Sequence, residues 1–201
     1  MKSQLLQSTL IDYAARNSRH EPHRRYIGLS GIADCDLVIY DRFFSGEKAS
    51  VGEKLKHFLA YEIQDILTRV LAEAFVYLPP QAIAVHGGLV QGHTDGAVLF
   101  EGQTDLIEIK TLENDKYLPI PGQRIPNRHF YQVQAYLHFL ELEHAHLIYF
   151  ARDSADLRVI GLTYNRTVGK GIQTKIDRLA AAVSESRRPA CTCGRCYKPK
   201  T

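Results

Sequence analysis

The sequence predicts an α/β fold, because two hydrophobic periodicities occupy different parts of the chain. Apolar residues recur at helical spacing in residues 51–71 and 172–183, whereas the period shortens toward two across residues 82–110. With 201 residues, of which 45% are hydrophobic and 23% charged, the composition is that of an ordinary globular protein. A chain of this length can bury one substantial core, so we expect a single domain over residues 1–201.

The first part of the chain is predicted to be helical. Residues 4–16 carry apolar side chains at helical spacing, and a second, short helix is expected to contain Cys35 and Tyr40. The segment SVGE at residues 50–53 has the pattern of a capping box, in which the serine oxygen and the glutamate carboxylate bind free amides. The helix that follows should be the longest and should pack one apolar face on the core.

A sheet is expected in the middle of the chain, interrupted and followed by helices. The domain core is placed at about residues 30–165, with the last helix and a cysteine-bearing tail at 166–201. The expected elements are strands at 82–86, 94–100 and 105–110, a helix at about 128–142, strands at about 146–151 and 157–162, and a last helix with Ile172, Ile176, Leu179 and Val183 on one stripe.

Charge and hydropathy limit the classes of function. The formal net charge of +3 permits a nucleic-acid partner without requiring one. No apolar run approaches the roughly 18 residues that a membrane-spanning helix needs, and the first residues lack the apolar block of a secretory signal. We therefore expect a cytoplasmic protein with no membrane partner. In a reduced cytosol, clustered cysteines are more often metal ligands than disulfides.

Two charged residues share one side of the strand expected at 105–110. Side chains two apart on a strand point the same way, so Glu108 and Lys110 lie together while Ile107 and Ile109 face a core. A hairpin with the preceding strand would bring the Asp95 carboxylate beside Glu108. Asp105 competes for the same role, but it shares the face of Ile107, and we therefore prefer Asp95.

Two carboxylates and a lysine suit the hydrolysis of phosphodiesters. That reaction needs a hard cation to neutralise the phosphate and activate a water molecule, and carboxylate oxygens are the ligands that such cations prefer. A neighbouring lysine can position the water or stabilise negative charge in the transition state. The alternative is a surface hairpin whose exposed edge carries Glu108 and Lys110 as solvated charges.

The order of the surrounding elements favours a catalytic site. His57 lies on the long helix before the strands, and Gln132 and Tyr136 lie one turn apart on the helix after them, with His129 near their face. Together with the segments GHTDG and IEIKT, this order resembles the RecB-like branch of the PD-(D/E)XK nuclease superfamily over about residues 30–150.

The resemblance implies a restriction-endonuclease-like core, with a mixed central β-sheet flanked by helices. It also implies Mg²⁺ or Mn²⁺ bound by His57, Asp95, Glu108 and the main-chain carbonyl of Ile109. Lys110 would be the catalytic lysine. Gln132 and Tyr136 would contact DNA or steady the site.

The four cysteines form a set of one early and three late residues, namely Cys35 in CDLVIY and Cys191, Cys193 and Cys196 in CTCGRC. This set resembles the CRISPR-associated RecB-like exonucleases, the fourth Cas protein, which implies a shared iron–sulfur cluster, [4Fe–4S] before [2Fe–2S]. The late spacing is narrower than in that family, and zinc would accept the same four thiolates. The alternative is a buried Cys35 and an unstructured basic tail.

The function that we expect is a metal-dependent DNA exonuclease acting on single-stranded DNA or free ends, as the resemblance implies. CRISPR adaptation proteins or phage recombination proteins are the partners that it suggests. The alternatives are a non-catalytic DNA-binding or adaptor module and a site-specific endonuclease. Two basic segments are candidates for phosphate contacts. They comprise Arg187, Arg188, Arg195, Lys198 and Lys200 in the tail, and Lys116, Arg124, Arg128 and His129 around the loop containing Pro119, Pro121 and Pro126.

Overall fold

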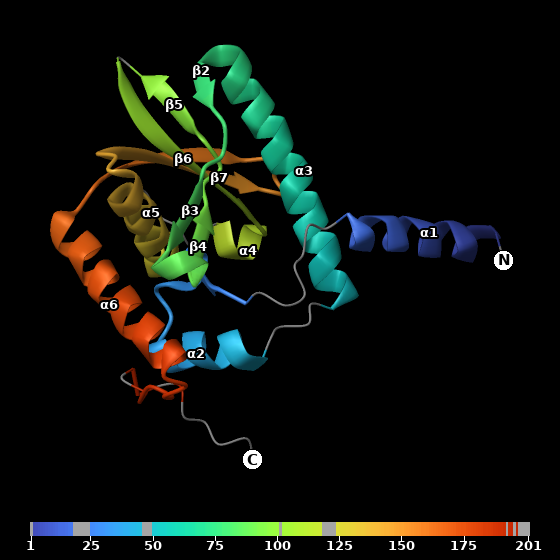
Figure 1. Cartoon of the computed structure of the whole chain (residues 1–201). Coiled ribbons are helices and arrows are strands. Elements are labelled where there is room, and N and C mark those ends of the chain that lie inside the picture. Colours follow the sequence, from blue (N-terminus) through green and yellow to red (C-terminus); the bar gives the residue numbers. More distant parts are fainter. Residues whose placement is uncertain are drawn as a thin grey trace.

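The structure, a computed structural model, describes residues 2–17, 25–45, 50–100, 102–117, 124–191, 193–194 and 196. Within these residues two β-sheets are flanked by helices (Figure 1). The helices are α1 (Lys2–Arg16), α2 (Asp36–Ser45), α3 (Val51–Ala74), α4 (Asn114–Tyr117), α5 (Asn127–Leu140) and α6 (Arg166–Ser184). The strands are β1 (Ile27–Gly28), β2 (Val76–Leu78), β3 (Ala82–Val85), β4 (Val90–His93), β5 (Ala97–Phe100), β6 (Gln103–Leu112), β7 (His144–Ala151) and β8 (Leu157–Thr163).

The larger sheet is mixed, with the strand order β2-β5-β6-β7-β8. Strands β5 and β6 form an antiparallel hairpin, as the sequence predicts, whereas β6 and β7 are parallel and pair Lys110 with Tyr149. Parallel strands need a crossover connection, and α5 lies within this one. The smaller sheet has the order β1-β4-β3, with β3 and β4 antiparallel. The predicted mixed α/β architecture is confirmed.

The alternation of side chains along β6 creates the two faces that the sequence predicts. Ile107 and Ile109 are buried with Val98 and Ile148 in a small cluster, against which Leu67 of α3 packs. The larger core, on which α5 and α6 pack, contains 23 buried residues of the described chain and includes Leu106 of the same strand. Glu108 and Lys110 project away from the small cluster, toward α5, as their hydrogen bonds with that helix show.

Helix α3 begins as the sequence predicts but packs less closely than expected. The Ser50 side chain accepts a hydrogen bond from the Glu53 backbone N–H, and Glu53 reciprocates, so the capping box is confirmed. Burial of a whole apolar face is wrong, because Leu59, Ile66 and Val70 remain 52%, 50% and 56% exposed. Helix α3 packs against the small cluster through Leu67 and Leu71, and its Phe58 ring contacts Tyr13 of α1.

Two local predictions need correction, and three short strands were not predicted. Asp95 lies in the connection between β4 and β5, not within a strand, because the strand predicted at 94–100 begins at Ala97. Cys35 directly precedes α2, and its carbonyl accepts a hydrogen bond from the Ile39 N–H within the first turn. The short strands β1, β2 and β4 were not predicted from the sequence. No helix among the described residues is long and apolar enough to span a membrane.

Candidate active site and cysteine centre

The Asp95 backbone is fixed by two glycines of the segment GHTDG. Gly92 faces the Tyr136 ring so closely that an added Cβ would lie 2.8 Å from it. Gly96 has φ +126°, which favours glycine, and a Cβ there would lie 2.2 Å from the Tyr77 hydroxyl oxygen. The same hydroxyl donates to the Asp95 carbonyl at 2.6 Å. Both glycines therefore serve close packing around Asp95.

The Asp95 carboxylate is held from two directions. Its Oδ1 accepts a hydrogen bond from Gln64 Nε2 of α3 at 2.6 Å, and its Oδ2 accepts one from the Ile109 backbone N–H at 2.7 Å. Burial raises the pKa of Asp95, while the Lys110 charge and these two hydrogen bonds oppose the rise. Asp95 therefore lies beside β6, where its charge and that of Lys110 interact.

Glu108, Lys110, Gln132 and Tyr136 form one hydrogen-bonded network. Glu108 Oε1 accepts from Lys110 Nζ at 2.5 Å and from Gln132 Nε2 at 2.7 Å. Gln132 Oε1 accepts from Lys110 Nζ at 2.9 Å, and Gln132 Nε2 also donates to the Tyr136 hydroxyl at 3.0 Å. This pattern fixes the Gln132 amide orientation, since the reverse would point its NH₂ group at the ammonium.

Glu108 is the buried carboxylate of this network. It is 2% exposed, and burial raises its pKa to about 8, although the Lys110 ammonium opposes the rise and the Asp95 charge adds to it. Its second oxygen, Oε2, is the one buried side-chain polar atom of the described residues without a hydrogen-bond partner. Because an unpaired buried carboxylate oxygen is costly, this atom suits a cation that would complete its contacts.

His57 lies on α3, two helical turns before Gln64, and is exposed. Within the described residues, the four cysteines are the one group of three or more possible ligands whose donor atoms lie within 4.8 Å of one another. His57 is therefore not gathered that tightly around Asp95 and Glu108. Gln64 was missed by the sequence reasoning, although its spacing of seven residues from His57 places both on one helical face.

Asp105, the rival of Asp95, lies on the other side of β6. Its Oδ2 is 2.9 Å from His146 Nε2 on β7. Asp105 is buried and shares the face of β6 that carries Ile107. The network around Glu108 does not include it. Its geometry is consistent with the preference for Asp95.

The four cysteines meet although more than 150 residues separate the early one from the late ones. All four sulfur atoms lie within 4.8 Å of one another, and the distance from Cys193 Sγ is 3.6 Å to Cys191 Sγ and 3.0 Å to Cys196 Sγ. Gly194, with φ +66°, forms the turn between the late cysteines. The backbone N–H groups of Cys196 and Cys193 lower the pKa of the Cys191 thiol. The predicted grouping of these cysteines is confirmed, close enough to hold a metal.

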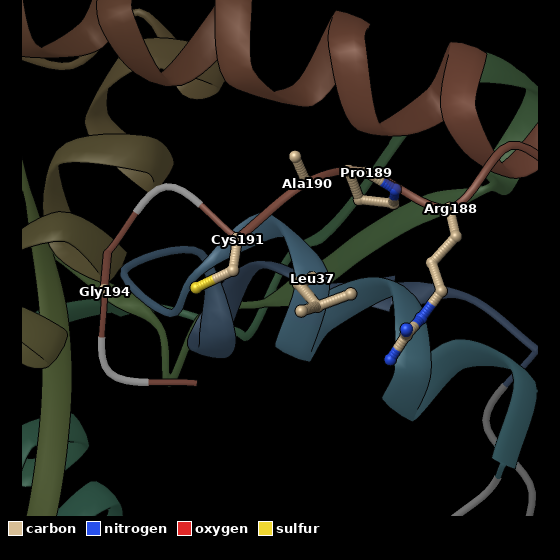
Figure 2. Close-up of a pocket in the computed structure, with 6 residues that line it drawn as sticks. All are labelled: Leu37, Arg188, Pro189, Ala190, Cys191 and Gly194. Atoms are coloured by element: carbon tan, nitrogen blue, oxygen red, sulfur yellow. The ribbon is translucent and has the colours of Figure 1, made fainter. Parts of the chain in front are cut away.

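Ion pairs fix the elements that carry the cysteines. Arg178 of α6 donates to Asp36, the residue after Cys35, at 2.7 Å, and Asp36 is buried. Arg188, three residues before Cys191, binds both oxygens of Asp41 on α2 at 2.8 and 2.6 Å. Beside the centre lies an open cavity of about 500 Å³ (Figure 2). It is lined by Leu37, Arg188, Pro189, Ala190, Cys191 and Gly194.

The two basic segments are only partly described. Arg195, Lys198 and Lys200 of the tail lie outside the described residues, as do Pro119 and Pro121 of the loop. Among the others, Arg188 is engaged by Asp41, and Lys116 is engaged by Glu113 at 2.9 Å. Arg124, Arg128 and Arg187 are exposed, and His129 is half-buried. Arg124, Arg128 and His129 lie at or just before the start of α5.

Similar folds occur in solved structures. No protein-family model matches the sequence, and no curated protein does. SSO0001 has a TM-score of 0.57 and 20% identity, covering 95% of this chain and 93% of its own. LHK-Exo in complex with dAMP has a TM-score of 0.63 and 14% identity, and the match covers 87% of this chain and 92% of LHK-Exo. A second structure, of the alkaline exonuclease LHK-Exo from Laribacter hongkongensis, has a TM-score of 0.59 and 14% identity, and the match covers 82% of this chain and 91% of that one. At these identities the similarity establishes the fold alone: this chain shares its fold with SSO0001 and with the exonuclease LHK-Exo.

Proposed function

We propose that this chain is a divalent-metal-dependent deoxyribonuclease that hydrolyses phosphodiester bonds. The observation that carries the proposal is the buried Glu108 carboxylate, whose Oε2 has no hydrogen-bond partner among the described residues and lies in a network with Lys110 beside Asp95. A carboxylate in this state is costly unless a cation or a proton completes it. The shared fold of an exonuclease adds support.

Asp95 and Glu108 would hold Mg²⁺ or Mn²⁺, and His57 and the carbonyl of Ile109 are the further ligands that we propose. The bound ion would neutralise the scissile phosphate and lower the pKa of the attacking water. To bind one ion together, the donor atoms of His57, Asp95 and Glu108 would have to come closer to one another, because they do not all lie within 4.8 Å of one another.

Lys110 would act on the reacting oxygens. Its ammonium has three donors, of which Glu108 Oε1 and Gln132 Oε1 accept two. The third has no partner among the described residues, and the side chain is 21% exposed, so it can reach a phosphate oxygen or a water molecule. Gln132 and Tyr136 would hold Glu108 and Lys110 in register, as positioning residues.

The substrate that we propose is DNA, with single strands or free ends preferred. LHK-Exo binds dAMP in a structure of this fold, which supports a nucleotide substrate. Exonuclease action is favoured over endonuclease action by the same similarity. The single-strand preference rests on the sequence resemblance, as do the proposed CRISPR adaptation or phage recombination partners. A single domain over residues 1–201 and a cytoplasmic location complete the proposal.

The cysteine centre is proposed to hold a structural metal. The sequence resemblance implies an iron–sulfur cluster, with [4Fe–4S] before [2Fe–2S]. A single tetrahedral zinc ion with sulfurs at about 2.3 Å would hold them roughly 3.8 Å apart, which suits the observed grouping within 4.8 Å. A [4Fe–4S] cluster would hold the four cysteine sulfurs further apart than zinc does, because each cysteine would bind a different iron. Iron, acid-labile sulfide and zinc analysis of anaerobically purified protein distinguishes these metals.

A second candidate is a non-catalytic DNA-binding or adaptor module with the same fold. The unpaired Oε2 of the buried Glu108 carboxylate argues against it, because a module that only binds DNA has no need of such a costly group. The deciding experiment incubates the protein with end-labelled single- and double-stranded DNA, with Mn²⁺ or with EDTA. Mn²⁺-dependent cleavage that Glu108→Gln abolishes supports the nuclease. Binding without cleavage supports the adaptor.

A further inference from the structure

A second polar pair adjoins the network of Glu108 and Lys110. His129, Gln132 and Tyr136 occupy one face of α5 at a spacing of three and four residues. Gln132 contacts Glu108, whereas His129 Nδ1 lies 2.8 Å from the hydroxyl of Tyr149, and their ring centroids are 5.5 Å apart. Tyr149 is the register partner of Lys110 in the parallel pair of β6 and β7. The His129–Tyr149 pair therefore lies directly beside the lysine.

The tautomer of His129 follows from the burial of Tyr149. The Tyr149 hydroxyl is fully buried, and His129 is its one hydrogen-bond partner in the described part of the chain. If Nδ1 carried the imidazole proton, the buried hydroxyl proton would have no acceptor, which is costly. Tyr149 therefore donates to Nδ1, and the imidazole proton lies on Nε2.

The Nε2–H group of His129 is available to a ligand. No described residue forms a hydrogen bond with it, and it is not among the buried unpartnered atoms, so it reaches solvent. Burial, Lys110 and Arg128 lower the pKa of His129 to about 4, which keeps the ring neutral at neutral pH. The sequence analysis counts His129 among the basic residues of this segment. In the structure it is a neutral hydrogen-bond donor near the Lys110 ammonium.

We infer that His129 Nε2–H binds a phosphate oxygen of the nucleic-acid strand next to the scissile phosphate, with Tyr149 fixing its tautomer. The inference rests on the proposed nuclease function, because the strand must lie along Lys110. An uncharged donor suits this position: it contacts an anion without repelling the Lys110 ammonium nearby, which an arginine or lysine would do.

The test is the affinity for a short fluorescent single-stranded DNA, measured by anisotropy in EDTA so that binding is scored without cleavage. His129→Asn keeps an amide near the Nδ1 position but lacks the outer donor, whereas His129→Gln carries its NH₂ group near the position of Nε2. We expect His129→Asn to weaken binding at least about tenfold, and His129→Gln to restore most of it. Thermal unfolding of each variant verifies the fold.

The dependence on salt separates this contact from a charged one. Arg128, the exposed neighbour, supplies the matched control: Arg128→Gln should lower the slope of log Kd against log salt by about 1, because one fewer counterion is released. His129→Asn should weaken binding with the slope unchanged. Tyr149→Phe, which frees the tautomer, should fall between His129→Asn and wild type.

Three results would overturn the inference: equal affinity of His129→Asn and wild type, equal loss in His129→Asn and His129→Gln, or a reduced salt slope in His129→Asn. The outcome is independent of catalysis, because binding is measured in EDTA. A wild-type protein that binds DNA but never cleaves it with Mn²⁺ refutes the proposed nuclease, while the comparison of variants still decides the phosphate contact. A wild-type protein that does not bind DNA refutes both.

Discussion

Replacement of Glu108 by glutamine should stabilise the metal-free protein while removing its activity. Burial raises the pKa of Glu108 to about 8, above its ordinary value of 4.5, so the folded state holds a proton that the unfolded chain releases. A folded state that binds more protons loses stability as pH rises, here between about 4.5 and 8. Glutamine keeps the size and polarity of the protonated side chain without this loss.

The magnitude follows from the proton. Holding a proton at pH 7 on a group whose ordinary pKa is 4.5 costs about 3 kcal/mol, at about 1.4 kcal/mol for each pH unit. The gain for Glu108→Gln should therefore be on the order of 2–3 kcal/mol at pH 7 and below 1 kcal/mol at pH 5. In a chain of this length, such a gain raises Tm by roughly 5–10 °C.

Thermal unfolding in EDTA at several pH values between 5 and 8 measures the difference. Mn²⁺ should then raise the Tm of the wild type and leave Glu108→Gln unchanged, because binding stabilises only a protein that retains its ligand. Glu113→Gln is the matched control: this half-buried carboxylate is paired with Lys56, Lys116 and Arg152, and its loss should not stabilise the protein. A Glu108→Gln variant less stable than wild type at pH 7 in EDTA would refute the reasoning.

Asp95→Ala and Lys110→Ala should abolish metal-dependent DNA cleavage with the fold preserved, whereas Asp105→Ala should keep most of it; the reverse order would transfer the ligand role to Asp105. His57→Ala should raise the Mn²⁺ concentration needed for half-maximal cleavage more than it lowers the rate at saturating Mn²⁺, since imidazole suits Mn²⁺ better than Mg²⁺. An unchanged Mn²⁺ titration would make His57 structural. Cys35→Ser, and deletion of residues 190–201, should each lower Tm.

Features that depend on neighbours in sequence were predictable. The capping box at Ser50 and Glu53 needs four residues, and the opposite faces of Ile107 and Glu108 need only the alternation of a strand. The hairpin of β5 and β6 is equally local. Each is set by periodicity or by a turn.

Features set by distant contacts were not predictable. Asp95 is positioned by hydrogen bonds with Gln64, 31 residues earlier, and with the Tyr77 hydroxyl, which has room because Gly96 lacks a Cβ. Strands β1 and β2, with two and three residues, are too brief to establish a period of two. The exposed face of α3 has the same apolar pattern as a buried one, because periodicity reports which side is apolar and not what covers it.

The cysteine centre extends this contrast, since one early and three late cysteines predicted a contact that no local pattern contains. A metal that joins Cys35 to Cys191 and its neighbours closes a loop of more than 150 residues, and closing it lowers the entropy of the unfolded chain. By analogy with a cross-link, the effect reaches about 4 kcal/mol, a large share of the roughly 5–15 kcal/mol by which domains are stable. Thiolate–metal bonds add to it.

Cys35→Ser and deletion of residues 190–201 should therefore each lower Tm, because each removes thiolates from the cysteine centre. Chelation of the metal should lower the Tm of the wild type to that of Cys35→Ser, and should leave Cys35→Ser itself unchanged. Arg188→Gln provides the comparison, because it removes the exposed pairing with Asp41 while leaving all four thiols, and its effect should be small. Metal-free preparations with the same Tm as metal-loaded ones, or a truncated chain that unfolds with the intact one, would show that the cysteines lie close without joining the two ends energetically.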